Sequence, residues 1–283
     1  MILKDFLPIN GLKWWIKCYR IVHFKFDTTF CPPPKPYTPR PEQCLAFYPL
    51  DCETVDYPEG NKSIKNTRVA LIGQHNQTTL RSIGNHFMVV QVIFQPGALY
   101  RILGIPLSEL VNAYLDADTF FGPNIHLINE QIFHALHYND IVNILDNNMM
   151  QIISSSKNLS SNNVDAVINI INTAPSQKLD LLAQQSFYSY KQFDRNFQLR
   201  TGLSPRYYQR IVRFDNAFRI RNFSKDLSWQ ALAWDANYTD YQHLVKDYKE
   251  FTGLSPHAFH NLGSPEEILG MAESFYEIEH RKG

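Results

Sequence analysis

Polar side chains that could hydrogen-bond to the edges of DNA bases gather in two short segments of the chain. In the first segment they are Lys191, Gln192, Asp194 and Arg195. In the second they are Tyr241, Gln242, His243 and Lys246. Arginine can make two hydrogen bonds to guanine, glutamine can make two to adenine, and an aromatic ring can contact the methyl group of thymine. Each set predicts a base-reading surface if one helix presents all four side chains together.

Side chains suited to DNA phosphates, either cationic or hydroxyl-bearing, lie close to these two sets. They are Ser189, Arg200, Arg206, Arg210, Arg213 and Thr239. The formal net charge of the chain is zero, but residues 175–260 carry 12 Lys or Arg against 8 Asp or Glu, which gives 12 − 8 = +4. We expect this local excess of positive charge to set affinity for DNA rather than sequence choice.

The elements that must position these side chains occur twice. The pentapeptide TGLSP at residues 201–205 recurs at residues 252–256, which is 51 positions later, and the pair Leu-Ala at 182–183 recurs at 232–233. Such self-similarity indicates a repeated structural unit. Each copy has the pattern of two short helices joined by a tight turn, which describes a helix-turn-helix, whose second helix fits the DNA major groove.

Capping signals predict where the helices of each copy begin and end. The predicted N-caps are Ser176, Ser189, Ser228 and Thr239. Gln192 and Gln242 lie three residues after Ser189 and Thr239, and each pair predicts a capping box. Gly202 and Gly253 are predicted to end the second helices, and the Ser-Pro pair that follows each glycine predicts the start of another helix. The helix after Gly202 is expected over residues 205–221.

The apolar residues of each second helix must face the core of their own unit. We therefore expect Phe193 and Phe197 to be buried in the first copy, and Leu244 and Tyr248 in the second. The polar sets named above are then left on the outer faces.

Residues 182–205, LAQQSFYSYKQFDRNFQLRTGLSP, and residues 232–256, LAWDANYTDYQHLVKDYKEFTGLSP, resemble the two helix-turn-helix signatures of the AraC/XylS family. The resemblance covers residues 164–262 and implies a bacterial, sequence-specific transcription regulator. Its implied partners are double-stranded operator or promoter DNA and RNA polymerase, and the base-reading positions of the family match the eight residues above. Phe187 departs from the family, whose turn has glycine there; a bulky residue at positive φ costs about 1 kcal/mol or more.

Residues 92–112, VIFQPGALYRILGIPLSELVN, are similar to the N-terminal domains of AraC-type regulators of Bacteroidota-like bacteria. The similarity implies a sensor or dimerisation domain over residues 1–153. A homodimer and a small-molecule effector, bound in a mostly apolar pocket, are therefore expected partners.

The predicted fold class is α+β, with a small barrel- or sandwich-like β-structure before an all-α domain. Short apolar runs that begin at Leu45, Arg68 and Phe87 predict strands. Six prolines within residues 32–41 predict a stiff extended loop. From Pro106 onward the apolar spacing predicts helices, over stretches that begin near residues 107, 128 and 141.

A serine- and asparagine-rich segment, SSSKNLSSNN at residues 154–163, predicts a flexible linker between two domains. The DNA-binding domain is then expected over residues 164–262. Residues 263–283 are acidic and predict a C-terminal helical tail.

Other classes of protein find little support in the sequence. There is no Gly-rich phosphate loop, GxSxG elbow or HExxH, so an enzyme is not expected. No run of eighteen apolar residues and no signal peptide is evident, which predicts a cytoplasmic protein. Four thiols do not match a zinc module and are expected to be reduced and mostly buried: Cys18, Cys31, Cys44 and Cys52.

Two histidine pairs at helical spacing, residues 134 and 137 and residues 257 and 260, lack carboxylate or thiolate partners in the sequence. No metal or cofactor is therefore predicted. The alternative function is a helix-turn-helix module that binds protein and not DNA. The cations Lys191, Arg195 and Lys246 favour the DNA-binding interpretation.

Overall fold

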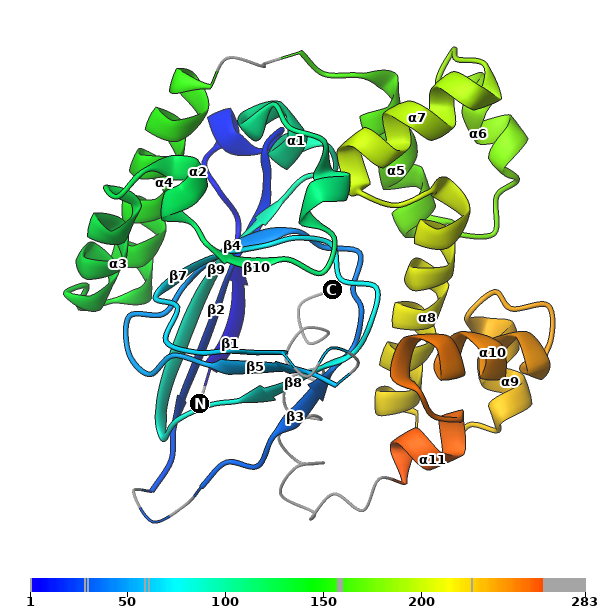
Figure 1. Cartoon of the computed structure of the whole chain (residues 1–283), viewed down its shortest axis with the longest axis horizontal. Coiled ribbons are helices and arrows are strands. Elements are labelled where there is room, and N and C mark those ends of the chain that lie inside the picture. Colours follow the sequence, from blue (N-terminus) through cyan, green and yellow to red (C-terminus); the bar gives the residue numbers. More distant parts are fainter. Residues whose placement is uncertain are drawn as a thin grey trace.

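The computed structural model describes residues 2–261 except positions 28, 30, 59, 61, 157–159 and 225. An N-terminal part of two sheets and several helices is followed by a part made only of helices (Figure 1). This arrangement confirms the predicted α+β class. The predicted tail at residues 263–283 lies outside the described residues.

The two sheets of the N-terminal part are antiparallel and lie face to face. The larger has the order β1-β2-β9-β4-β7-β10. Its strands are β1 (Ile2–Phe6), β2 (Ile16–Lys25), β9 (His86–Phe94), β4 (Cys44–Phe47), β7 (Val69–Ile72) and β10 (Tyr114–Asp116). The smaller sheet consists of β3 (Lys35–Tyr37), β8 (Thr79–Ser82), β5 (Thr54–Tyr57) and β6 (Lys62–Ile64), in that order. The strands predicted from Leu45, Arg68 and Phe87 are confirmed as β4, β7 and β9.

Alternate residues of the larger sheet face different partners, as the period of a strand requires. Val22 and Val89 are buried on the face toward the smaller sheet, whereas Ile21 and Val90 are buried on the opposite face. That opposite face is covered by helices (Figure 1). They are α1 (Ala98–Leu103), α2 (Asp118–Phe121), α3 (Ile125–Phe133), α4 (Tyr138–Ser155) and the 3-10 turns at Asn10–Leu12 and Leu107–Leu110.

Two expectations for the N-terminal part are wrong. The helical spacing from residue 107 yields only the 3-10 turn Leu107–Leu110, because the chain then pairs as strand β10, with Tyr114 opposite Ile72. The proline-rich segment is not a loop throughout, because β3 pairs within it with β8. The helices predicted near residues 128 and 141 are confirmed as α3 and α4.

Seven helices follow among the described residues. They are α5 (Asn163–Thr173), α6 (Leu179–Gln185), α7 (Tyr190–Thr201), α8 (Pro205–Phe223), α9 (Trp229–Asp235), α10 (Tyr241–Thr252) and α11 (Pro256–His260). The pairs α6–α7 and α9–α10 are the two predicted helix-turn-helix units, and α8 links them. Because α4 ends at Ser155 and α5 begins at Asn163, the segment predicted as a linker overlaps the end of α4.

The core of the helical part has the predicted residues at its centre. Phe193 and Phe197 on α7, and Leu244 and Tyr248 on α10, are all fully buried in one shared cluster. The apolar faces of the two second helices therefore point inward, which leaves their other faces to solvent.

Most of the predicted helix ends are confirmed. Ser189 and Gln192 form a capping box at α7, Ser228 caps α9, and Gly202 and Gly253 end α7 and α10 in the left-handed conformation. Two caps are wrong. Residue Ser176 precedes the start of α6 at Leu179, and Asp240 rather than Thr239 caps α10, with its Oδ1 accepting from His243 N at 2.9 Å. The extra residue of the second copy lies before this cap, so the 51-residue spacing aligns Asp240 with Ser189.

The tight turns of the two units each place one residue at positive φ. Phe187 has φ 59° and Asn237 has φ 63°, at matching positions of the two copies. Phe187 adopts this left-handed conformation although it is 87% exposed and gains little from packing.

Replacing Phe187 with asparagine should therefore stabilise the protein by about 1 kcal/mol, because asparagine tolerates positive φ better than a bulky residue does. Urea unfolding of the two proteins measures the difference. The reciprocal change, Asn237→Phe, should destabilise by a similar amount. An unchanged or lower stability of Phe187→Asn would show that the turn is not strained.

Candidate nucleic-acid interface

The predicted base-reading side chains of the first unit lie together on the outer face of α7. Lys191, Gln192 and Arg195 are exposed, and Asp194 is half-buried. They occupy the side of the helix opposite to the buried phenylalanines. The structure thus brings this set onto one surface of the molecule.

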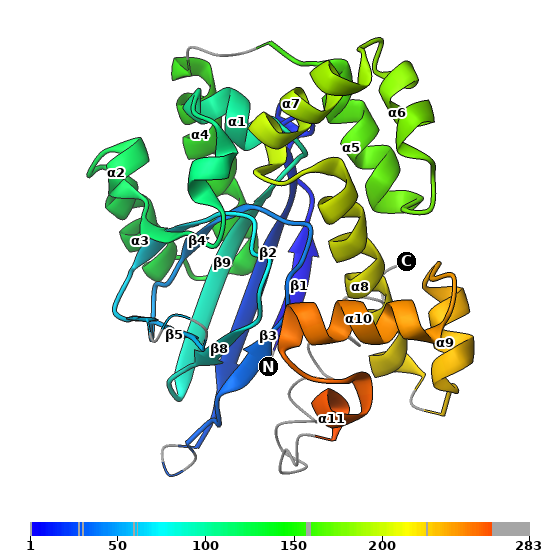
Figure 2. The same cartoon turned by 45° about the vertical axis from the view of Figure 1, so that its right-hand side comes forward.

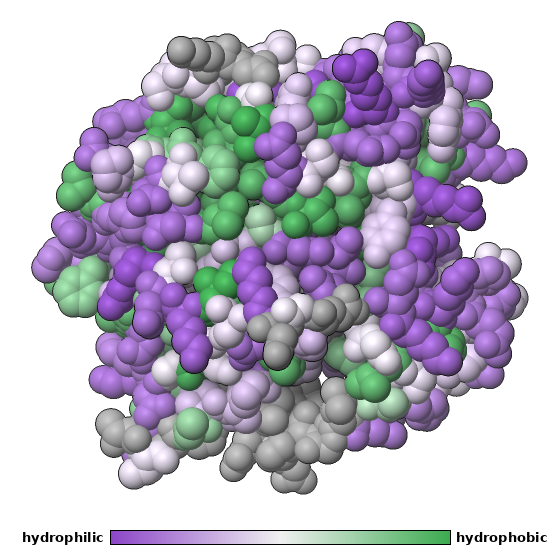
Figure 3. Space-filling model, in the orientation of Figure 1, coloured by the Kyte–Doolittle hydropathy of each residue, from purple (hydrophilic) through white to green (hydrophobic). Residues whose placement is uncertain are grey.

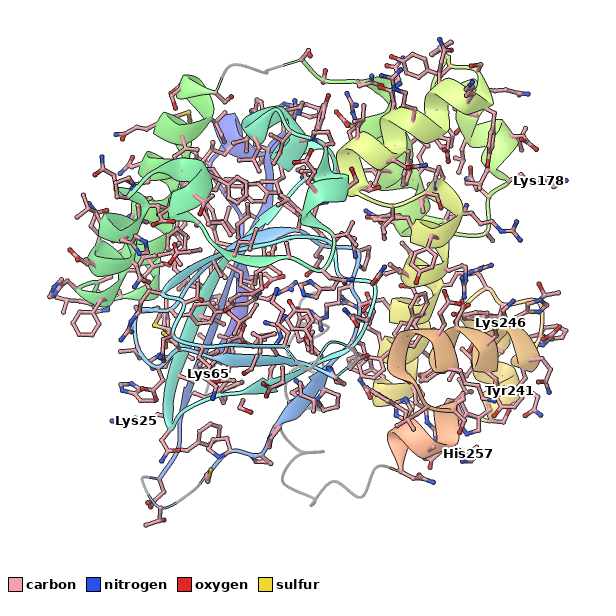
Figure 4. All side chains as sticks on the ribbon, in the orientation of Figure 1. Lys25, Lys65, Lys178, Tyr241, Lys246 and His257 are labelled. Atoms are coloured by element: carbon pink, nitrogen blue, oxygen red, sulfur yellow. The ribbon has the colours of Figure 1, made fainter. Side chains whose placement is uncertain are left out.

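The corresponding set of the second unit lies on α10. Gln242, His243 and Lys246 are exposed, and Tyr241 is half-buried. Figure 4 shows Tyr241 and Lys246 at the outer edge of the helical part, on the side away from the sheets. In Figure 2, where this side comes forward, α10 lies across the lower half of α8. The surface over these helices is mostly hydrophilic, whereas apolar residues gather over the N-terminal part (Figure 3). Both predicted sets therefore lie on polar, solvent-facing surface.

Some of these side chains already form hydrogen bonds, either with the N-cap residue of their own helix or with a residue one turn away. Gln192 Oε1 accepts from Ser189 N at 3.1 Å, and Asp194 Oδ2 accepts from Gln198 Nε2 at 2.7 Å. The ring of His243 lies 3.0 Å from Asp240 Oδ2. Three charges, those of Lys191, Arg195 and Lys246, have no ion pair with any residue that the structure describes. These three side chains can approach DNA without breaking an ion pair within the described part of the chain.

Four of the residues predicted to contact phosphate are exposed or half-buried. Ser189 and Thr239 are exposed, one at the N-cap of α7 and the other just before the N-cap of α10. Helix N-termini favour anions because their first N–H groups are unpaired. Arg206 is exposed in the first turn of α8, and Arg213 is half-buried, with its guanidinium 5.3 Å from the ring centre of Tyr238.

The structure corrects the prediction for Arg200. This side chain is buried, with its Nε 2.9 Å from Asp165 Oδ1 and its guanidinium 4.8 Å from the ring centre of Tyr100. Asp165 belongs to α5 and Tyr100 to α1, so Arg200 lies where the helical part meets the N-terminal part. In this arrangement it cannot reach a phosphate group.

Arg210 is half-buried and forms ion pairs with two residues of the protein. Its Nη2 lies 2.7 Å from Asp247 Oδ1, and both of its terminal nitrogens bond to Glu250. Asp247 is 4% exposed and accepts a further hydrogen bond from Tyr238 Oη at 3.0 Å. Arg210 therefore ties α8 to α10 instead of contacting a phosphate.

Two of the paired histidines pack against aromatic rings, and the cysteines form no disulfide bond with one another. The rings of His257 and His260 lie 5.3 and 5.6 Å from Trp229, and His260 Nε2 hydrogen-bonds to Tyr248 Oη at 3.0 Å. All four cysteines are free thiols, of which Cys18 and Cys44 are buried and Cys31 is exposed. In the part of the chain that the structure describes, no helix is long and apolar enough to cross a membrane.

Two known domain families match separate parts of the chain. Residues 182–261 match the family described as a helix-turn-helix domain, and residues 4–116 match a domain of unknown function, DUF6597. No curated protein matches the chain.

Solved structures of regulators are similar to it at low sequence identity. The apo form of a ToxT variant from Vibrio cholerae has a TM-score of 0.47 at 8% identity, over 85% of this chain and 96% of that chain. ToxT bound to an unsaturated fatty acid has a TM-score of 0.45 at 10% identity, over 87% and 96% of the two chains. The DNA-binding domain of AdpA, in complex with a target DNA, has a TM-score of 0.30 at 20% identity, over 44% and 100%.

The helix-turn-helix match extends from α6 to α11 and so includes both units of the repeat. Each unit has a buried apolar face, a left-handed turn and a polar outer face on its second helix. The chain therefore carries a helix-turn-helix domain over residues 182–261 and a DUF6597 domain over residues 4–116 of its N-terminal part.

Proposed function

We propose that the chain reads two adjacent major-groove segments on one face of double-stranded DNA, with α7 in one segment and α10 in the next. The observation that carries the proposal is that α7 and α10, the equivalent helices of the two units, each present a mostly exposed set of polar side chains. The connecting helix α8 has 19 residues. It is therefore about 28 Å long, close to the 34 Å that separates successive major-groove segments on one face of the duplex.

Each exposed side chain has a role that its chemistry supports. Arg195 and Lys246 are proposed to bind guanine, and Gln242 to bind adenine. The other members of the two sets lie on the same faces of α7 and α10: Lys191, Gln192, Asp194, Tyr241 and His243. Proposed phosphate contacts are Ser189, Thr239, Arg206 and Arg213. Arg200 and Arg210 are left out because both are paired inside the protein.

Removing one base-reading cation from each unit tests this proposal. We expect Arg195→Ala and Lys246→Ala each to weaken binding to the preferred duplex by about 1–3 kcal/mol, since each removes a contact to a base edge. Arg206→Ala should instead weaken binding to all duplexes alike and flatten the salt dependence by about one unit of slope. Fluorescence anisotropy at several salt concentrations separates these two effects.

Lys65→Ala serves as the matched control, because Lys65 is an exposed cation of the N-terminal part, far from α7 and α10 (Figure 4). It should bind DNA like the wild type. Equal losses in Lys65→Ala and Lys246→Ala would show that general charge, and not the α10 surface, accounts for binding.

We also propose that a small-molecule effector binds between the two sheets and controls the DNA-binding part. A cavity of about 80 Å³ lies there. Its apolar walls include Val22, Phe24, Ile72, Phe87 and Val89. Its polar lining includes Arg40, Glu42, Glu53, His75 and Arg81. A ligand with an apolar body and a polar head fits this division of the walls.

The polar lining is itself ordered by internal contacts. Arg81 pairs with Glu53, which also accepts a hydrogen bond from Tyr48 Oη. Burial lowers the pKa of His75 to about 3, so its ring is neutral. The ring nitrogens of His75 bond to Tyr57 Oη and to the carbonyl of Gly73. A bound polar head would therefore meet a preorganised set of partners.

Two segments beside this cavity form hydrogen bonds with α7 and α10, the second helices of the two units. Gln43, between Glu42 and Cys44 of the cavity wall, donates from Nε2 to the carbonyl of Thr201 at the end of α7, at 3.3 Å. Thr78, three residues after His75, donates from N and Oγ1 to the carbonyl of Phe251 in the last turn of α10, at 3.0 and 2.9 Å. A ligand that displaces either segment would act on the two helices proposed to read DNA, which is the coupling that effector control requires.

We also propose that the protein forms a homodimer, acts in the cytoplasm and contacts RNA polymerase. A homodimer would read two such sites, as direct or inverted repeats. An apolar surface around α3 supports it, since Leu127, Phe133 and Leu136 are 52%, 55% and 88% exposed. Light scattering of the purified protein measures its mass and so tests the dimer.

A further inference from the structure

His23 and His86 lie side by side at one end of the larger sheet, on the face that the helices cover. In the antiparallel pairing of β2 with β9, His23 is opposite Met88 and Lys25 is opposite His86, so the two histidines are diagonal neighbours. Their Nε2 atoms are 3.3 Å apart, and their ring centres are 5.4 Å apart with an angle of 26° between the planes. The two rings thus point nitrogen toward nitrogen.

These distances are close to those of two imidazoles that share one metal ion. Zinc–nitrogen bonds of about 2.0–2.1 Å at a tetrahedral angle place the two nitrogens about 3.3 Å apart and the ring centres about 5.2 Å apart. A direct N–H···N hydrogen bond is the other interpretation, and 3.3 Å is long for an N–H donor. Little movement of either ring is needed to admit an ion.

A third residue fixes the orientation of His23, the half-buried member of the pair. Nδ1 of His23 forms a hydrogen bond of 3.0 Å with Oη of Tyr138, the first residue of α4. When Nδ1–H donates to that oxygen, the lone pair of Nε2 points toward His86. Hydrogen bonds of this kind to the far nitrogen orient metal-binding histidines and fix their tautomer.

The site is open to solvent on one side. A cavity of about 620 Å³ is lined by His23, His86 and Tyr138 together with residues from α3 and α4. Among the residues that the structure describes, the only cluster of three potential metal ligands is Asp116, Asp118 and His126, which lies elsewhere. Water would therefore complete the coordination of an ion held by the two histidines.

We propose that His23 and His86 form a two-nitrogen binding site for a divalent late transition-metal ion, with Tyr138 as its positioning residue. Imidazole nitrogen suits Cu²⁺, Ni²⁺ and Zn²⁺, and the affinity should follow the usual order, with Cu²⁺ bound most tightly. A bound ion would join β2 and β9 directly, and α4 through Tyr138. This site is independent of the proposed DNA-binding surface.

Titration of the tag-free full chain with CuCl₂, followed by calorimetry and electron paramagnetic resonance, tests the proposal. We expect one ion per chain, a spectrum split by two nitrogen ligands, and weaker binding of Ni²⁺ and Zn²⁺. His23→Ala and His86→Ala should each weaken binding at least about tenfold and remove the two-nitrogen splitting. Tyr138→Phe should weaken it about tenfold through the lost orientation while the splitting remains.

His126→Ala is the control, because it removes the other candidate cluster and should leave the titration unchanged. The proposal is overturned if the wild type binds no ion, if His126→Ala alone abolishes binding, or if both histidine variants bind like the wild type. Should His23→Ala fail to fold by circular dichroism, His86→Ala decides the matter, since the His86 side chain is exposed.

Discussion

Replacing Gly202 with alanine should destabilise the protein far more than the same change at Gly253, although the two glycines hold matching positions in the repeat. Both have positive φ, 85° and 74°, so an alanine at either position costs about 1–2 kcal/mol. A Cβ at Gly202 would also lie 2.6 Å from the carbonyl oxygen of Leu107 and 2.8 Å from Val111, whereas a Cβ at Gly253 would meet nothing within 4 Å. Overpacking of this kind adds about 1–3 kcal/mol.

The difference between the two variants measures the contact between the N-terminal part and α7. Urea unfolding of Gly202→Ala and Gly253→Ala gives the two losses of stability. If that contact restrains α7, Gly202→Ala should also change affinity for DNA or its response to an effector, and Gly253→Ala should change neither. Equal losses of stability in the two variants would mean that the two parts do not meet as described, and the proposed effector control would lose its structural support.

Replacing Arg210 with alanine should also lower the free energy of unfolding by a large amount. Arg210→Ala leaves the carboxylate of Asp247 buried with Tyr238 Oη as its remaining hydrogen-bond donor, and an uncompensated buried charge costs about 3–5 kcal/mol. Arg206→Ala is the matched control, because Arg206 is exposed on the same helix and its loss should change stability by less than about 0.5 kcal/mol. Thermal and urea unfolding compare the two.

A second substitution separates the ion pair from other effects. Adding Asp247→Asn to Arg210→Ala removes the stranded charge, so the double variant should be more stable than Arg210→Ala alone. If Arg210 instead contacted phosphates, Arg210→Ala would lower DNA affinity and leave the stability near that of the wild type. That outcome would restore the role predicted from the sequence.

Features set by neighbouring residues could be predicted from the sequence. The two units, the capping box at Ser189, the glycines that end α7 and α10, and the buried faces of both helices all depend on local patterns. The position of Phe187 in a left-handed turn could also be predicted, because the repeat aligns it with Asn237. The cap at Asp240 was missed, although the 51-residue spacing of the flanking sequence contained the signal.

Features that depend on distant partners could not be predicted. Arg200 and Arg210 look like free cations in a basic stretch, but Asp165 and Asp247 neutralise them from 35 and 37 positions away. Strand β2 could not be predicted from alternation, because its ten residues are buried on both faces for most of their length. The apolar spacing after Pro106 predicts a helix, because spacing alone cannot show that Tyr114 pairs with β7.

Selection of binding sites from random duplex DNA shows whether α7 and α10 read two separate groove segments, when the wild type, Arg195→Ala and Lys246→Ala are carried in parallel. We predict that the wild type enriches a motif of two blocks whose centres are about one helical turn apart. Arg195→Ala should relax the base preference in one block, and Lys246→Ala should relax it in the other. Relaxation of the same block by both variants would contradict reading by two separate helices. A folded wild type that enriches no motif, with and without candidate effectors, would contradict DNA recognition itself and favour a protein-binding role for the two units.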